Sequence, residues 1–241
     1  DLPWGYCASP WIVDGKLSVN PGAADASLIA LEPVTGNVIW KSPGAAPSYG
    51  SFAVGTFHGR KQIVGHDAVS LGGWDIVTGK RLWSAKPDNT GDFNVPTPIV
   101  LKDRLLIATE NNGARLFDFS HDGTLKMPPV SANPKLRPDM STPTVANGRV
   151  YCVNRFLYCL DLNDNLNELW RIRDSAFGDY AAMFVSEDRM LIVGNGELLL
   201  VPTDGRKKIL SRQKIFAEKL PIYSHAALVG NRLFVRGESR L

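Results

Sequence analysis

The chain has 241 residues, of which 44% are apolar and 21% are charged, and its formal net charge is +3. This composition is that of a folded protein with an ample apolar core, and it excludes a disordered chain. The charge is too small to indicate nucleic-acid binding, and the longest compact apolar run, Glu197–Pro202, is too short for a membrane-spanning helix of about 20 residues, so we expect no membrane insertion.

The predicted strands form a pattern that returns along the chain. The first copy consists of Ser9–Val13, Gly15–Val19, Ser27–Pro33 and Asn37–Ser42. A later copy consists of Thr142–Ala146, Arg149–Asn154, Phe156–Leu162 and Asn167–Ile172. Apolar residues in these segments often alternate with polar or small ones, which is typical of strands, and no segment has a sustained helical period. We therefore expect an all-β chain built from repeated four-stranded sheets.

A tryptophan near the end of each copy gives the length of the repeat. Trp40 and Trp83 are 43 residues apart, and Trp170 follows after two further intervals of similar length. Met127 stands where the intervening tryptophan is due. A period of about 43 residues is typical of repeats that each form one four-stranded β-sheet.

Two further sequence features recur at the same interval as the tryptophans. Polar turns that predict hairpins occur at Asp14-Gly15, His58-Gly59, Lys102-Asp103, Asn147-Gly148, Glu187-Asp188 and Gly230-Asn231. A small residue, often beside a proline, precedes each hairpin and gives six repeat starts, although the sixth copy stops at Leu241 after two strands. Asp1–Tyr6 is expected to add at most one strand.

The segments Ala30–Trp40 and Leu71–Trp83 resemble the signature A-x-D-x-x-T-G-x-x-x-W of pyrroloquinoline-quinone-type (PQQ-like) β-propeller repeats. The resemblance implies a β-propeller in which each four-stranded sheet is one blade. Thr35-Gly36 and Thr78-Gly79 would then form the turns between third and fourth strands.

The resemblance also implies that Trp40, Trp83 and Trp170 dock between neighbouring blades. Met127 would fill the docking position in the third blade, and Ile209 or Leu210 would fill it in the fifth. Trp83 is therefore expected to be a core residue. Trp74, which we place in a Gly-Gly-Trp turn, is expected to contribute less to stability.

We expect residues 1–241 to form one propeller domain, as a fragment of a larger chain with seven or eight blades. A six-bladed ring with an incomplete last sheet is the alternative. The repeat sequences most resemble those of uncharacterised propeller proteins of planctomycete-like bacteria. They are also similar to those of the lipoprotein propeller of the outer-membrane protein assembly machinery.

Quinone-dependent dehydrogenases share this repeat, but their hallmarks are not found in the sequence. The chain has no adjacent cysteine pair and no carboxylate-rich loop for calcium, whose coordination needs six or more oxygen ligands. The closest candidate, Asn163–Asn165, falls where a blade turn is due. We therefore expect no PQQ, no calcium, no metal site and no catalytic residue, and we favour a protein that is not an enzyme.

Cys152 and Cys159 lie on the two arms of a predicted hairpin whose tip is near Arg155-Phe156. The spacing allows them to be direct cross-strand neighbours, which could form a strained disulfide or remain two buried thiols. We favour the thiols. Cys7 has no evident partner.

Polar residues at the starts of the repeats could form a ring at one mouth of the central channel of a propeller. These candidates are His225, Thr97, Thr142 and Ser51. His58 and His121 fall in predicted turns, and His66 falls on a loop between strands. No pattern pairs a histidine with a nucleophile or a metal.

Two functions compete. We favour a non-catalytic scaffold of the bacterial cell envelope, periplasmic or extracellular, whose loops bind another protein or another domain of the same chain. The longest and most irregular connections are Ala45–Tyr49, Lys86–Phe93 and Lys126–Asp139, and the last is expected to protrude most. The alternative is a ligand-binding or degenerate quinone-dependent oxidoreductase propeller.

Overall fold

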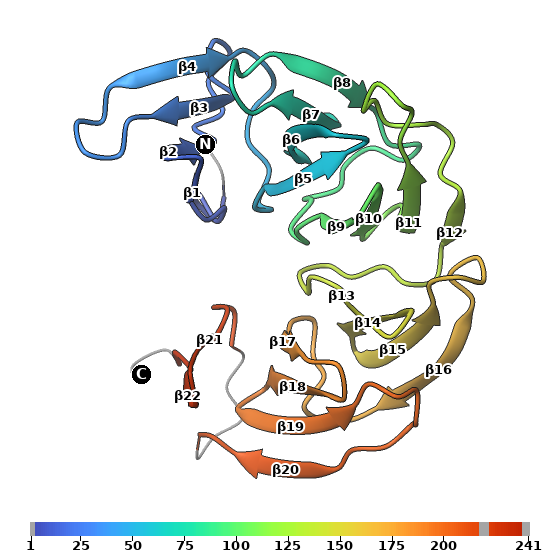
Figure 1. Ribbon diagram of the computed structural model, residues 1–241. Coiled ribbons are helices and arrows are strands. Elements are labelled where there is room, and N and C mark those ends of the chain that lie inside the picture. Colours follow the sequence, from blue (N-terminus) through green and yellow to red (C-terminus); the bar gives the residue numbers. More distant parts are fainter. Residues whose placement is uncertain (1–2, 217–221, 238–241) are drawn as a thin grey trace. The chain divides into compact units, whose positions relative to one another are not determined.

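The computed structural model describes residues 3–216 and 222–237 of the chain, and these residues contain strands and turns but no helix. No helix among them is therefore available to cross a membrane. Five sheets have four strands each, and a sixth has two. The neighbouring strands for which pairing is defined run antiparallel, and strands that follow one another in sequence lie side by side in each sheet (Figure 1).

The strands are as follows. The first sheet contains β1 (Trp11–Val13), β2 (Lys16–Val19), β3 (Leu28–Leu31) and β4 (Val38–Ser42). The second contains β5 (Ala53–Phe57), β6 (Arg60–His66), β7 (Leu71–Asp75) and β8 (Arg81–Ala85). The third contains β9 (Ile99–Leu101), β10 (Arg104–Thr109), β11 (Gly113–Asp118) and β12 (Ser131–Asn133).

The remaining sheets continue the same order. The fourth contains β13 (Thr144–Ala146), β14 (Arg149–Asn154), β15 (Phe156–Asp161) and β16 (Glu168–Arg173). The fifth contains β17 (Ala182–Val185), β18 (Arg189–Gly194), β19 (Glu197–Pro202) and β20 (Ser211–Lys214), and the last pair is β21 (Ala227–Val229) with β22 (Arg232–Phe234). The predicted strands of the first and fourth copies and all six predicted repeat starts are confirmed.

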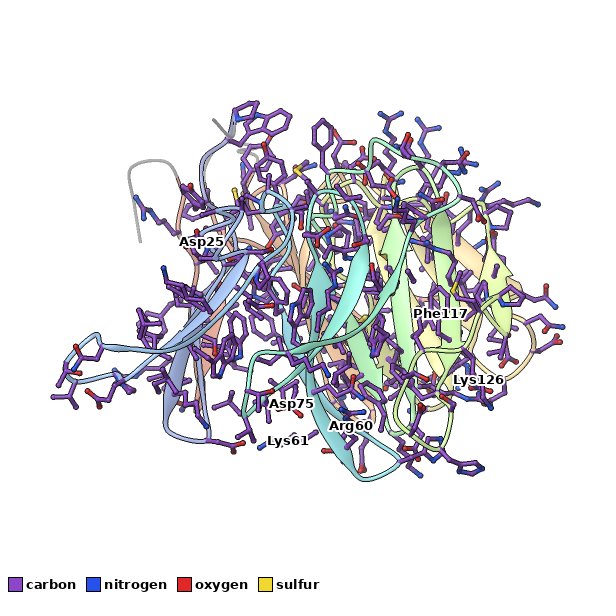
Figure 2. The ribbon with its side chains drawn as sticks, turned by 90° about the horizontal axis from the view of Figure 1, so that it is seen from above. Asp25, Arg60, Lys61, Asp75, Phe117 and Lys126 are labelled. Carbon is purple, nitrogen blue, oxygen red and sulfur yellow. The ribbon has the colours of Figure 1, made fainter. Side chains whose placement is uncertain are left out.

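The signature D-x-x-T-G is explained by the turn between β7 and β8. Asp75 accepts hydrogen bonds from the backbone amides of Val77 and Thr78 at 3.0 and 2.9 Å, and from the Thr78 hydroxyl at 2.9 Å. Partial burial of Asp75 opposes its ionisation, but the hydrogen bonds from Thr78 and Val77 and the nearby charge of Arg60 outweigh this effect and lower its pKa. Figure 2 shows Asp75 near Arg60 and Lys61. The aspartate therefore fixes the turn through its ionised carboxylate.

The chain forms two compact units, Asp1–Ala132 and Asn133–Leu241. The first unit has one apolar cluster around Trp40, Phe52 and Trp74, and another around Phe57, Leu105 and Phe119. The second unit has a large cluster built on Tyr151, Leu157, Ile192 and Leu199, and a smaller one on Val193 and Ile222. In both units side chains from successive sheets pack against one another, because each strand turns alternate residues to opposite faces.

The third repeat departs from the prediction at Met127. This residue is 54% exposed, so its expected place as a docking residue is wrong. The chain pairs with β11 at Lys126, whose amide donates to Asp118 O at 2.9 Å, and again at Val130, whose amide donates to Leu116 O at 2.8 Å. Between them Pro128 and Pro129 have no N–H to donate, so the fourth strand starts only at Ser131.

The segment Lys126–Asp139 is therefore not the protruding loop that we expected. It contains β12, and the side chain of Leu136 is fully buried. The backbone amides of Lys135 and Leu136 donate to the Asn133 carboxamide at 2.9 and 3.3 Å, which fixes the turn that follows the strand. The prolines at the start of this segment interrupt the pairing of its chain with β11.

The favoured interpretation of Cys152 and Cys159 as buried thiols is confirmed, although the two are not direct cross-strand neighbours. Cys152 pairs with Tyr158 across the hairpin and Cys159 pairs with Tyr151, so the two cysteines are one residue out of register and point to opposite faces of the sheet. Both are free and buried. The described part of Asp1–Tyr6, from Pro3 onward, forms a turn and contributes no strand.

Candidate functional site

The contacts of Trp40 explain why a glycine follows the threonine in the next repeat. A Cβ atom on Gly79 would lie 2.3 Å from the Trp40 ring, so the ring occupies the space that any other residue would fill. Gly79 also has φ +72°, a conformation that favours glycine. Trp40 of the first sheet thus packs directly on the turn between the third and fourth strands of the second sheet. We propose that it is a blade-docking residue, and that Gly79 docks with it.

Trp83 reaches the next sheet through a buried glutamine. Its Nε1 donates to Gln62 Oε1 at 2.8 Å, and Gln62 Nε2 donates to Gly123 O at 2.5 Å. The Trp83 ring also lies edge-on to Phe119, the residue that follows β11 of the third sheet, with centroids 5.7 Å apart. Gly73 makes room for this ring, since a Cβ there would lie 2.2 Å from Trp83 Nε1.

The second unit repeats this arrangement with other residues. Trp170 on β16 donates from Nε1 to Gly205 O, in the next turn of this type, at 2.7 Å. Asn133, at the end of β12, donates from Nδ2 to Leu166 O at 2.7 Å, and Leu166 holds the turn position of Gly36 and Gly79 with φ +56°. Ile209 packs against the large apolar cluster, whereas Leu210 is 36% exposed. We propose that Trp170 and Ile209 are blade-docking residues of the fourth and fifth repeats.

A phenylalanine at position 83 should test the hydrogen-bonded contact. Trp83→Phe keeps an aromatic ring but leaves the buried Gln62 oxygen without its donor, so we expect a loss of about 1–3 kcal/mol in the free energy of unfolding. Trp40→Phe removes the same atoms, and Trp40 Nε1 has no hydrogen-bond partner among the described residues, so its loss should be smaller. Denaturant unfolding followed by circular dichroism measures both. Equal losses would contradict a special role for the Trp83–Gln62 bond.

Trp74 was expected in a turn and lies instead in the middle of the first unit. It belongs to β7 and is fully buried, with the Arg81 guanidinium 4.7 Å from its ring centroid. Arg81 is held there by Asp67 at 2.7 Å and by the Ser70 hydroxyl at 2.7 Å. The two glycines before Trp74 are therefore strand residues that leave space for Trp83 and Arg81.

Three aromatic side chains form a cluster on the loops of the first unit. The rings of Trp4 and Phe93 are 5.0 Å apart, those of Trp4 and Tyr49 are 5.4 Å apart, and those of Tyr49 and Phe93 are 6.0 Å apart. Tyr49 is buried beneath the other two, whereas Trp4 is 63% exposed and Phe93 is 49% exposed. We call these three residues the aromatic cluster. It brings together two of the three loops that the sequence singled out.

Hydrogen bonds fix the loop that carries Phe93. Asp92 accepts from the Asn111 amide at 2.7 Å and from Asn112 Nδ2 at 2.5 Å. Asn89 and Asn112 exchange two further bonds at 2.9 and 2.8 Å, and Glu110 accepts from the Phe93 amide. The hairpin between β10 and β11 therefore holds this loop in place. The polar residues of Glu110–Gly113 form the hydrogen bonds that hold the Phe93 loop.

The four channel-mouth candidates occupy equivalent places, each two residues before the first strand of its sheet. Ser51 and Thr97 belong to the first unit, and Thr142 and His225 belong to the second. The Ser51 hydroxyl accepts a hydrogen bond from the Ser9 amide at 2.9 Å, and the His225 ring lies 5.5 Å from that of Phe184. These contacts tie the starts of the sheets to their own units. A polar ring formed by the four residues stays a prediction.

Among residues 3–216 and 222–237, no group of three or more histidine, cysteine, aspartate or glutamate side chains could hold a metal ion. His58 and His121 lie in exposed turns as expected, with their rings 5.1 Å apart. His66 differs from the prediction because it is the last residue of β6 and is only 6% exposed. Neither its burial nor the aromatic cluster has a signal in a single sequence, because both depend on which loops meet in space.

Comparison with known proteins identifies the repeat. Residues 24–127, less than half of the chain, match the family described as outer membrane protein assembly factor BamB. BamB from Moraxella catarrhalis has a similar structure, with a TM-score of 0.67 and 15% sequence identity, covering 96% of this chain. The chain has the fold of a PQQ-like β-propeller. Its sheets are therefore propeller blades, and the described residues form five blades of four strands and a sixth of two strands.

Two other solved structures are similar to the chain at similarly low sequence identity. The computationally designed Ika8 protein has a TM-score of 0.66 at 11% identity, covering 94% of this chain. A functionally unknown protein from Desulfotomaculum acetoxidans has a TM-score of 0.62 at 14% identity, covering 90%. The chain spans 67%, 66% and 72% of the lengths of the three matched structures. No curated protein matches the sequence.

Proposed function

We propose that this propeller is a non-catalytic scaffold of the bacterial cell envelope that binds another protein, or another domain of its own chain, through the aromatic cluster. The observation that carries the proposal is the exposure of Trp4 and Phe93 above the buried ring of Tyr49. Most large aromatic side chains of a folded protein are buried, so two neighbouring exposed rings on one surface call for a function.

The chemistry of the cluster suits a protein partner. Tryptophan and other aromatic residues dominate the binding energy of protein interfaces, since they bury a large area and lose little conformational entropy. Phe93 sits on a loop that Asp92, Asn89 and Asn112 fix to the neighbouring hairpin, so little order has to be gained on binding. A fixed loop with an exposed aromatic tip is well suited to recognition.

The envelope location is proposed from the family description and the structural similarity. The matched family is described as an outer membrane protein assembly factor, and the similar Moraxella protein is BamB. A scaffold in that compartment needs no bound cofactor, and we propose none for this chain.

Photo-crosslinking in intact cell envelopes tests the proposal. With p-benzoylphenylalanine in place of Phe93, we expect a crosslink to one protein, or an internal crosslink that identifies a domain of the same chain. Val34 is the matched control, because it is 91% exposed and apolar but lies in the turn between β3 and β4, outside the cluster. Position 34 should give no such product.

A binding measurement with the identified partner completes the test. Phe93→Ser should weaken binding by about tenfold or more, as expected for a hot-spot aromatic residue, and Val34→Ser should leave it unchanged. Phe93 is 49% exposed and Val34 is 91% exposed, so neither change should unfold the protein. The proposal fails if positions 34 and 93 give the same crosslinks, or if neither gives any.

A further inference from the structure

A cavity of about 300 Å³ lies within the first unit, and the three residues of the aromatic cluster are not among its lining residues. Its walls come from the end of β6, the turn into β7, the end of β8, the loop after β8 and the middle of β11. The apolar part of the lining includes Ala68, Leu71, Ala85, Pro87 and Phe117, the last of which is labelled in Figure 2. The polar part includes His66, Arg115, Asp92 and Lys86.

His66 supplies an unsatisfied polar atom to this lining. The side chain is 6% exposed, and its Nδ1 is buried without a hydrogen-bond partner among the described residues. Burial, with a smaller contribution from the charge of Arg115, lowers the pKa of His66 to about 4, so the ring is neutral at pH 7. An unpaired polar atom at a buried site is costly and calls for a partner that the protein alone does not supply.

Arg115 supplies a positive charge that forms no ion pair with a carboxylate of the described residues. Its Nη2 donates to the Thr109 hydroxyl at 3.1 Å, and its buried Nε has no hydrogen-bond partner in the described part of the chain. No ion pair joins Arg115 to an aspartate or glutamate of that part, although the charges of Asp92 and Asp88 act on it from a greater distance. Asp92 accepts hydrogen bonds from Asn111 and Asn112. A largely buried guanidinium without an ion pair is a ready site for an anion.

We propose that this cavity binds a small organic carboxylate. The planar guanidinium of Arg115 matches the two oxygens of a carboxylate, and His66, which has a buried nitrogen without a described partner, is a lining residue of the same cavity. The lining contains two positive side chains, Lys86 and Arg115, and one negative side chain, Asp92, so its net charge is +1. This charge suits a monoanion better than a phosphate dianion. The apolar walls would accommodate a hydrocarbon or aromatic group. This ligand site goes beyond the scaffold function and does not depend on it.

Binding of 4-fluorobenzoate, followed by ¹⁹F NMR on the whole chain, tests the site. We expect saturable line broadening with the wild-type protein and none with 4-fluorobenzamide, which has nearly the same shape but no charge. Arg115→Met should weaken benzoate binding by about tenfold or more, since it removes a charge-assisted hydrogen bond. Arg104→Met is the matched control, because it removes the same charge from the same sheet but Arg104 pairs with Asp118 and does not line the cavity.

The titration of His66 provides a second readout that needs no variant. Benzoate should raise the pKa of the His66 ring above its value of about 4, because a bound anion stabilises the imidazolium among the surrounding charges of Arg115, Lys86, Asp92 and Asp67. NMR of the histidine ring measures this shift. The proposal is overturned if benzoate does not bind, if the amide binds equally well, or if the two methionine variants lose the same affinity. An unmoved His66 pKa in the presence of saturating benzoate would also overturn it.

Discussion

Replacing Trp74 with alanine should lower the free energy of unfolding by about 3–5 kcal/mol, the range for a large-to-small change at a fully buried tryptophan. Trp74 has no exposed surface and packs with Phe52, whose ring centroid is 5.5 Å away, within the apolar cluster that joins the first two blades. The change would also leave the Arg81 guanidinium without the ring beneath it. Denaturant unfolding followed by circular dichroism measures the loss.

Trp83→Ala is the comparison for this result. Trp83 is partly exposed, so less apolar area returns to water when its ring is removed, and the loss should be smaller than for Trp74. This order is the reverse of the one that the sequence predicted. A greater loss for Trp83→Ala would mean that the docking contact, through Gln62 and Phe119, outweighs the core position of Trp74.

Replacing Gly79 with alanine should destabilise the chain by about 2–5 kcal/mol, because two costs add. The residue has φ +72°, where a side chain costs about 1–2 kcal/mol. The added methyl group would also lie 2.3 Å from the Trp40 ring, and overpacking of this kind costs about 1–3 kcal/mol.

Gly36→Ala separates the two costs. Gly36 has nearly the same φ of +73° in the equivalent turn, but an added Cβ there meets nothing within 4 Å. Gly36→Ala should therefore lower the free energy of unfolding only by the backbone cost, about 1–2 kcal/mol. Thermal or denaturant unfolding of the two variants gives the difference. Equal losses would show that Trp40 gives way without cost, and that the docking role proposed for Trp40 and Gly79 is wrong.

The fold could be predicted largely from the sequence because its determinants are local. Turns such as Asp14-Gly15 and Asn147-Gly148 have positive φ at both residues, as two-residue hairpin turns require. The aspartate, threonine and glycine of the β7–β8 turn contact one another within five residues. Features that depend on a few neighbouring residues leave a repeated pattern in a single sequence.

The errors arose where a single residue or a side chain from another strand changes the outcome that the repeat predicts. The sequence placed a docking residue at Met127 by counting along the repeat, but the prolines after it delay the fourth strand to Ser131. Trp74 was placed in a turn because glycines precede it, whereas these glycines accommodate the side chains of Trp83 and Arg81. The one-residue shift between Cys152 and Cys159 likewise follows from the position of the hairpin tip at Arg155.

The candidate sites were the least predictable part. The loops Ala45–Tyr49 and Lys86–Phe93 were singled out for their length, but only the structure shows that their aromatic residues meet Trp4. His66 and Arg115 come from different sheets, and neither belongs to a motif. Periodicity indicates how blades are built and gives no information on which side chains line a cavity between two of them.

The docking contacts have a consequence for how such a chain changes over time. Trp170 and Asn133 donate to backbone oxygens of the turns they meet, and Trp40 packs where a glycine has no side chain. The receiving turn offers only main-chain atoms at these points, so it accepts a neighbour with little regard to that neighbour's sequence. Repeats joined in this way can be duplicated, lost or exchanged without a matching change in the adjacent repeat, and each can diverge at its loops while its attachment to the next is preserved.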